Sequence, residues 1–144
     1  MGSAKGWTGE SGVEAIQETT EIHGGTSSVK LTRTSTEGED TEYKSDYFPV
    51  IAETAYTITA WFLDKDEFDA KARILIRWYD SEKTELSVNY KNYSADNSDW
   101  SEKIASVVSP VDAVFARAGI RIYADGGAVT GIYLYMDDFE ITAD

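Results

Sequence analysis

The sequence contains one eight-residue pattern twice, and this repeat constrains the fold more than any other feature. The pattern Ala-Arg-x-x-Ile-Arg-x-Tyr occupies residues 72–79 (ARILIRWY) and 116–123 (ARAGIRIY), and it contains four of the five arginines. Successive side chains of an extended strand point to opposite faces, so each copy predicts a strand with one arginine face and one apolar face. The predicted arginine face comprises Arg73, Arg77, Tyr79, Arg117, Arg121 and Tyr123. Trp78 shares the opposite face with Ile74 and Ile76, which indicates a core position.

Strand patterns occupy most of the remaining sequence. Residues 55–63 (AYTITAWFL) alternate apolar and polar side chains and are rich in β-branched and aromatic residues, which favours a strand over a helix. The expected strands are residues 13–22, 28–34, 43–50, 55–63, 72–79, 100–108, 115–123 and 131–142. Between the first arginine strand and residue 100 we expect a long polar connection that carries Tyr90 and Tyr93. Because turn signals separate short strands and no amphipathic helix of ordinary length emerges, the sequence predicts an all-β sandwich.

The chain length and charge limit the organisation and the partners. A chain of 144 residues is most simply one domain, so we expect a disordered or vector-derived N-terminus at residues 1–6 and a single β-sandwich module at 7–144. The formal net charge is −13, with 26 acidic against 13 basic side chains. Nucleic acid and anionic membranes are therefore disfavoured as partners, because both attract positive surfaces.

The sequence has no cysteine, which excludes disulfides and thiolate metal sites and leaves the compartment undetermined on that ground. It also lacks an apolar run long enough to span a membrane, and its first residues lack the apolar segment of a signal peptide. If the native protein is secreted, its signal lies outside these residues.

Catalysis finds little support in the sequence. His23 is the only histidine and lies in a turn cluster, and no serine has the G-x-S-x-G context of a nucleophile elbow. Phosphate-binding glycine loops are also missing. Paired carboxylates for glycoside hydrolysis stay open with 26 acids in the chain, although none stands out in an aromatic cleft.

A series of short motifs resembles a known family. In order they are GGTSSVKL, YFPV, AYTITAWF, IRWYD, DW, SPVDAVFAR and YMDDFEI, and they cover about residues 13–142. Their order and spacing resemble the jelly-roll carbohydrate-binding modules of the family 4/9 type. Members of that group usually begin with an Asn-Gly-x-Phe-Glu-like strand, which has no match before Gly6-Trp7 here. That first strand, and the metal ligand it would carry, are therefore not matched.

The resemblance implies a jelly roll of about eight strands and a particular strand order. One sheet would contain residues 28–34, 115–123, 55–63 and 72–79, which places Trp61 on a central strand between the two arginine strands. Lys30 and Thr32 would extend the same solvent-exposed, concave face, and this face would bind a glycan. The resemblance also implies that Trp7 and Trp100 pack against the sandwich.

The residue types on this face suit a saccharide. A pyranose ring has apolar faces and a polar rim, so a site needs aromatic planes for the faces and multi-donor groups for the oxygens. The proposed carbohydrate contacts are Trp61, Tyr79, Tyr123, Arg73, Arg77, Arg117 and Arg121, with Tyr90 and Tyr93 in reserve. Guanidinium groups also pair with carboxylates, which adds uronate-containing polymers to the candidate ligands. The alternative is that arginines and aromatics stabilise the sheet as cross-strand pairs without a ligand.

A structural calcium ion is the second hypothesis. Asp137 and Asp138 are consecutive in an otherwise apolar strand, so one of them points inward and needs a partner. Modules of the resembling family commonly hold calcium here, which implies Asp137 as a side-chain ligand and Gly25 and Ser27 as backbone ligands. The alternative is a hydrogen-bonded aspartate at a strand end.

These observations together lead us to expect a non-catalytic module. It would be secreted or at the cell surface and would target a covalently linked polysaccharide-degrading catalytic domain to β-glucan, mannan, xylan or a uronate-containing polymer. The main alternative is a β-sandwich spacer or protein-contact domain that binds no sugar. A third alternative, a small lyase or hydrolase, would release products from such polymers.

Overall fold

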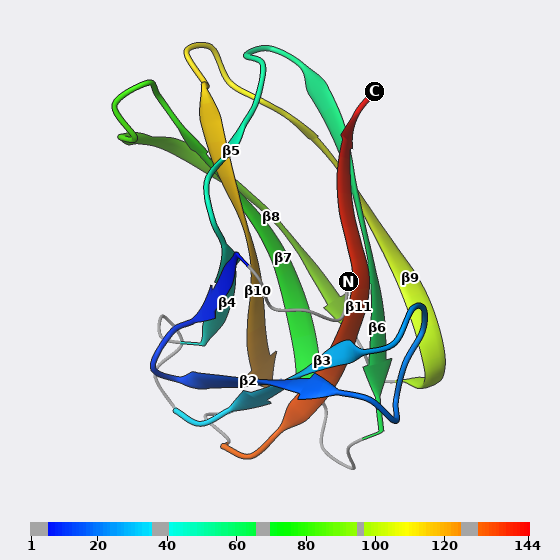
Figure 1. Cartoon of the computed structure of the whole chain (residues 1–144). Coiled ribbons are helices and arrows are strands. Elements are labelled where there is room, and N and C mark those ends of the chain that lie inside the picture. Colours follow the sequence, from blue (N-terminus) through cyan, green and yellow to red (C-terminus); the bar gives the residue numbers. More distant parts are fainter. Residues whose placement is uncertain (1–5, 36–40, 66–69, 95–96, 125–129) are drawn as a thin grey trace.

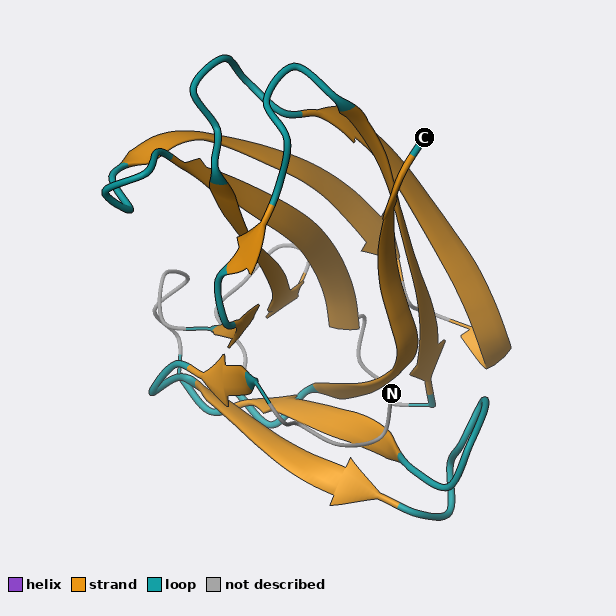
Figure 2. Ribbon diagram, turned by 45° about the horizontal axis from the view of Figure 1, so that its top comes forward, coloured by secondary structure: helices purple, strands orange, loops and turns teal. Residues whose placement is uncertain are grey.

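The protein is a two-layered β-sandwich (Figure 1). The computed structural model describes residues 6–35, 41–65, 70–94, 97–124 and 130–144. Its strands are β1 (Trp7–Gly9), β2 (Val13–Glu18), β3 (Ser28–Arg33), β4 (Glu42–Ser45), β5 (Phe48–Pro49), β6 (Ala55–Asp64), β7 (Ala70–Tyr79), β8 (Glu85–Ser94), β9 (Asn97–Val108), β10 (Phe115–Ala124) and β11 (Tyr133–Ala143). Strands and loops account for all the described residues, as Figure 2 shows, so the predicted all-β class is confirmed. None of these residues belongs to a helix that could cross a membrane.

Two antiparallel sheets form the layers. Sheet A has the order β1-β4-β10-β7-β8, with β5 also pairing to β10, and sheet B has the order β2-β3-β11-β6-β9. The predicted strand at residues 43–50 is divided between β4 and β5. Of the predicted N-terminal segment 1–6, residues 1–5 lie outside the described part of the chain.

The core lies between the sheets and follows the alternation of the strands. Trp78 on β7 is completely buried, and Tyr56 and Tyr43 belong to the same core cluster. Trp7 stacks on Tyr43 with ring centroids 5.2 Å apart and meets Phe139 edge-on at 5.1 Å. The predicted core role of Trp78 and the packing role of Trp7 are therefore confirmed.

The predicted strand order is wrong for two strands. The two arginine strands, β7 and β10, do belong to one sheet, but they pair directly with each other. β6 and β3 lie in sheet B, where Trp61 is paired with Asp137 of β11 and Glu102 of β9. Trp61, Lys30 and Thr32 are thus separated from the arginines. The prediction failed because the alternation of a strand indicates its buried face but not which strand pairs with it.

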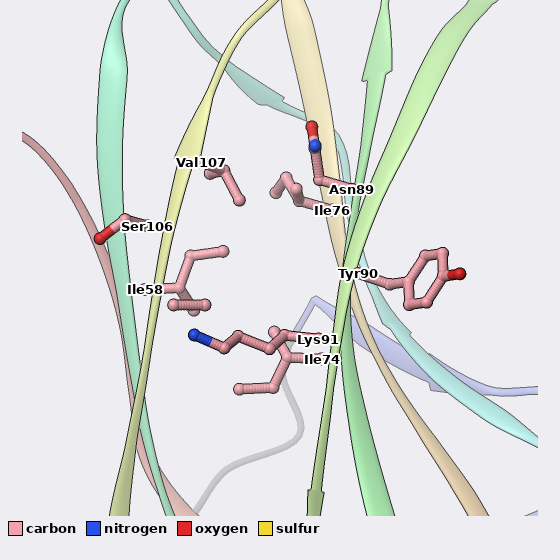
Figure 3. A pocket seen from close by; sticks show the side chains of 9 residues that line it. Ile58, Ile74, Ile76, Asn89, Tyr90, Lys91, Ser106 and Val107 are labelled. Atoms are coloured by element: carbon pink, nitrogen blue, oxygen red, sulfur yellow. The ribbon is translucent and has the colours of Figure 1, made fainter.

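β8 is a second correction, because residues 85–94 were expected within a polar connection. They form a ten-residue strand at the edge of sheet A, paired with β7. In Figure 3, Asn89 and Lys91 point towards Ile58, Ile74 and Ile76 between the sheets. Tyr90 points the opposite way, onto the outer face of sheet A.

Candidate functional site

The outer face of sheet A brings the two arginine strands together. In the antiparallel register Arg77 lies opposite Arg117, and Arg73 lies opposite Arg121. The intervening residues Ile74 and Ile120 are buried on the inner side. The four guanidinium groups therefore share one face, as the repeat predicts, and like charges directly opposite each other need compensation.

Glu42 of β4 supplies that compensation. It lies opposite Arg121 in the register and is completely buried, although it belongs to the outer face. Its Oε1 accepts a hydrogen bond from Arg77, while its Oε2 is 3.7 Å from Arg121 Nη2 and 4.0 Å from Lys44 Nζ. Burial alone lowers the pKa of Arg77, but the hydrogen bond and charge of Glu42 outweigh it and raise that pKa. Arg77 is therefore a permanently charged group at the centre of the face.

Gly119 makes room for this carboxylate. It lies on the outer face of β10 between Arg117 and Arg121, opposite Lys44. A Cβ atom on Gly119 would be 2.0 Å from Glu42 Oε1 and 2.8 Å from Glu42 Cδ. The side chain of Glu42 therefore crosses the position where any other residue would place its own.

One end of the face is an arginine between two tyrosines. The guanidinium carbon of Arg73 is 4.8 Å from the ring centre of Tyr90 and 5.4 Å from that of Tyr123. Tyr90 is 63% exposed, which makes it the most exposed aromatic side chain described on this face. The structure thus brings the reserve residue Tyr90 to the predicted site, whereas the side chain of Tyr93 lies outside the described residues.

The other end has a similar composition. The ring of Tyr47, which precedes β5, is 4.9 Å from that of Tyr79 in an edge-on arrangement, and the Arg117 guanidinium carbon lies 5.0 Å from the Tyr47 ring centre. Arg117 Nε donates to the carbonyl of Ser45 at 2.8 Å. Tyr79 itself is only 8% exposed, and burial raises the pKa of its hydroxyl. Tyr47, rather than Tyr79, is the accessible ring at this end.

Trp61 belongs to a different cluster on the outer face of sheet B. His23 stacks on its ring with centroids 3.8 Å apart and planes 19° apart, and the Trp100 ring lies 5.8 Å from His23. One face of the Trp61 ring is therefore covered from within the chain. The prediction that Trp61 lies among the arginines is wrong, and Trp100 packs against the loop before β3.

The carboxylate of Asp137 is occupied by backbone donors. Its Oδ2 accepts from the amides of His23 and Gly24, each at 3.0 Å, and its Oδ1 accepts from the amide of Asp138 at 2.8 Å. The hydroxyl of Ser27 interacts with Gln17, at 3.1 Å from Nε2. Calcium would need oxygen ligands, and these contacts of the Asp137 carboxylate are with backbone N–H groups.

Within the described ranges, no three histidine, aspartate or glutamate side chains lie together in a group that could hold a metal. The observed bonds match the alternative of a hydrogen-bonded aspartate. Calcium binding itself stays an untested prediction.

A small pocket opens between the sheets along β8 and β9 (Figure 3). Its volume is about 80 Å³, and Ile58, Ile74, Lys91 and Val107 are among the residues that line it. Asn89 at its wall accepts a hydrogen bond from the buried indole N–H of Trp78 at 2.6 Å. This hydrogen bond gives the indole N–H of Trp78 an acceptor within the core. The pocket itself is too small for a sugar ring with its hydroxyls.

Sequence reasoning missed Glu42, Gly119 and Tyr47. Glu42 alternates with the apolar Tyr43, which places it on an outer face, but only the pairing of β4 with β10 brings it to the arginines. The sequence therefore indicates on which face of its strand Glu42 lies, but it does not indicate which residues Glu42 contacts.

Neither a protein-family model nor a curated protein matches the sequence. Solved structures do match. The enzymatically active domain of tailspike protein 4 from bacteriophage CBA120 matches with a TM-score of 0.74 at 11% identity, over 99% of this chain and 20% of that one. The CBM22-1 xylan-binding domain of Xyn10C from Paenibacillus barcinonensis matches with a TM-score of 0.69 at 13% identity, over 99% of this chain and 88% of that one.

A third match is to the CBM22-1 and GH10 modules of the Clostridium thermocellum endo-1,4-beta-D-xylanase 10B complexed with xylohexaose. Its TM-score is 0.71 at 15% identity, over 97% of this chain and 26% of that one. The chain thus spans about a fifth to a quarter of the two longest of these matches. At such identities the likeness establishes the jelly-roll fold alone, and the family 4/9 assignment stays a prediction.

Proposed function

We propose that the protein is a non-catalytic carbohydrate-binding module and that its binding surface is the outer face of sheet A. The main observation in support is the arrangement of this face, in which a charged centre of Arg77, Arg121 and Glu42 lies between two aromatic ends. One end presents Tyr90 and the other Tyr47, each next to an arginine. The similar xylan-binding domain of Xyn10C supports the same class of function.

The physical argument is complementarity to a sugar chain. An exposed tyrosine ring stacks on the apolar face of a pyranose, and guanidinium groups donate several hydrogen bonds in a plane to the ring oxygens and hydroxyls. Two of these guanidinium groups are already held in place: that of Arg73 lies between two tyrosine rings, and that of Arg77 is hydrogen-bonded to Glu42. A preorganised surface loses little side-chain entropy on binding.

The module would act by targeting. We place it in a secreted or cell-surface protein, linked covalently to a catalytic domain that degrades the bound polysaccharide. The match to a xylanase in which a CBM22 module and a GH10 module occur together supports this arrangement. β-Glucan, mannan, xylan and uronate-containing polymers are the candidate ligands, and calcium forms no part of the proposal.

Affinity electrophoresis of the purified protein in gels containing each soluble polymer tests the proposal. We expect at least one polymer to retard migration, and Tyr90→Ala to weaken that retardation roughly fivefold, since one stacking contact is worth about 1 kcal/mol. Tyr133→Ala is the matched control, because Tyr133 lies on β11 of sheet B. Unchanged migration of the wild-type protein in all polymers would support the spacer or protein-contact alternative instead.

A further inference from the structure

Arg121 is a guanidinium group without a hydrogen bond among the described residues. Its Nε is buried and has no hydrogen-bond partner. Its nearest carboxylate oxygen, Glu42 Oε2, is 3.7 Å from Nη2, which is beyond hydrogen-bonding distance, and the other oxygen of Glu42 is bonded to Arg77. The side chain nevertheless retains 21% exposure, so a ligand can reach it. A partly desolvated guanidinium with unused donors favours an anionic acceptor.

Arg117, on the same strand, also has no carboxylate hydrogen-bonded to it among the described residues. Its Nε donates to the carbonyl of Ser45, and its guanidinium plane lies against the ring of Tyr47. No contact of its two terminal nitrogens with a carboxylate occurs within the described ranges. Arg117 and Arg121 are on the same face of β10, with only Gly119 between them on that face.

The described part of this face is positive, opposite in sign to the chain as a whole. In the described ion pairs and tyrosine contacts of its arginines and lysine, five side chains are positive (Arg73, Arg77, Arg117, Arg121 and Lys44) and three are negative (Glu10, Glu42 and Glu85). The whole protein carries a net charge of −13. A polyanion would be repelled by most of the surface, so it could bind only where positive groups are concentrated.

We propose that the saccharide bound by sheet A carries carboxylate groups, so that its chain contains uronic acid residues, and that Arg121 and Arg117 pair with them. This inference rests on the proposed function and specifies its ligand class. A planar carboxylate accepts two parallel N–H bonds from a guanidinium group, a geometry that a single sugar hydroxyl does not offer.

Glu42 acts in this scheme as a positioning residue. Its carboxylate is completely buried beneath the arginines and does not contact solvent, so it does not present a negative charge directly to a ligand. It fixes Arg77 by a hydrogen bond and lies 3.7 Å from Arg121 Nη2, so it attracts Arg121 without forming a hydrogen bond to it. Among the arginines, Glu42 pairs with Arg77 and Arg121 only, so it leaves Arg73 and Arg117 as positive groups of the face without the Glu42 carboxylate as a partner.

The test compares a polyuronate with its own neutral form. Polygalacturonate, alginate and glucuronoxylan would each be used in native and carboxyl-reduced form, in affinity electrophoresis and in calorimetric titrations with the wild-type protein. We expect at least one native polymer to bind, and reduction of its carboxyl groups to weaken binding about tenfold or more, the effect of losing a charge-assisted hydrogen bond.

Two variants assign the effect to this face. Arg121→Gln is expected to bring the ratio of native-polymer to reduced-polymer affinity close to one, whatever affinity for the reduced polymer remains. Lys30→Gln, which removes one positive charge from β3 of sheet B, is the matched control and should leave the preference unchanged. Thermal unfolding of each variant establishes that it is folded.

The possible failures are distinguishable. Equal binding of native and reduced polymers, or a preference that survives in Arg121→Gln, overturns the acidic-ligand inference but leaves the carbohydrate-binding proposal standing. The same holds if only neutral β-glucan, mannan or xylan is bound. If no polymer of either kind is bound, the proposed function and this inference both fail.

Discussion

At the scale of single residues, the outer face of sheet A depends on one acid and one glycine. Glu42 is buried among Arg77, Arg121 and Lys44, and it occupies the space above Gly119. Burying a carboxylate is unfavourable unless it is paired, and breaking such a pair costs more than forming it gains. The pairing therefore holds the arginines in position, and it is weak evidence for stability.

Gly119→Ala should destabilise the protein through Glu42. The added methyl group would displace the Glu42 carboxylate from Arg77, and we expect the free energy of unfolding in urea to fall by about 1–3 kcal/mol. In a Glu42→Ala background the same substitution should instead be neutral or stabilising by up to about 1 kcal/mol, because alanine is preferred to glycine in a strand. Additive effects in this double-mutant cycle would show that the two residues do not interact.

The residues of this face were only partly predictable from sequence. The alternation of ARILIRWY and ARAGIRIY correctly placed Arg73, Arg77, Arg117 and Arg121 on one face. The role of Glu42 was not predictable, because it arises from a pairing between β4 and β10 that are far apart in the chain. The alternation of residues within a strand determines which face each side chain is on, whereas the contacts of that side chain depend on which strand is paired next to it.

At the scale of elements, the segment between β2 and β3 is held against β11. Asp137 accepts the amides of His23 and Gly24, and His23 Nδ1 is 2.6 Å from Asp138 Oδ2. The His23 ring also covers Trp61 of β6. The acidic pair that suggested a calcium site thus anchors a loop through hydrogen bonds.

This anchor predicts a pH dependence of stability. The hydrogen bond from His23 lowers the pKa of Asp138, against a smaller opposing effect of burial. The ionised carboxylate therefore stabilises the fold above the pKa of an unfolded aspartate, and this contribution is lost as the pH falls through the lowered value. Asp138→Asn removes the contribution and keeps a residue that tolerates the left-handed backbone at φ 48°.

The measurement is urea unfolding of both proteins over a series of pH values. The wild-type protein should be more stable than Asp138→Asn near neutral pH, and the difference should shrink as the pH falls from about 5 to below 3. Asp112→Asn is the matched control for removing one negative charge at a left-handed position, since Asp112 has φ 69°. A difference between wild type and Asp138→Asn that stays constant with pH would contradict the assigned role.

β8 shows why one element was missed. Its sequence ELSVNYKNYS alternates Leu86, Val88 and Tyr90 with polar residues on the other side. In a central strand of the sandwich, the polar side chains would be on the outer, solvent-exposed face. In β8 the polar side chains of Asn89 and Lys91 instead point into the space between the two sheets, at the edge of sheet A (Figure 3). Inward polar residues are typical of protected edge strands, and they make such a strand resemble a loop in sequence.

At the scale of the whole molecule, the fold class was predictable and the strand order was not. Eight strand segments were predicted from the sequence, and a two-sheet sandwich is the arrangement that buries their apolar faces. The position of β6 in sheet B, with Trp61 on its outer surface, required long-range pairing with β9 and β11. The molecule therefore presents two separate aromatic surfaces, one with arginines and one with histidine.

The most direct test of the proposed binding surface is an amide chemical-shift titration of the ¹⁵N-labelled protein with the oligosaccharide of the best-bound polymer. The account predicts that the largest shifts fall on β7, β8 and β10, around Arg73, Tyr90, Arg117 and Arg121, while the indole signal of Trp61 stays unchanged. Largest shifts at Trp61, His23 and Trp100 on sheet B would contradict it.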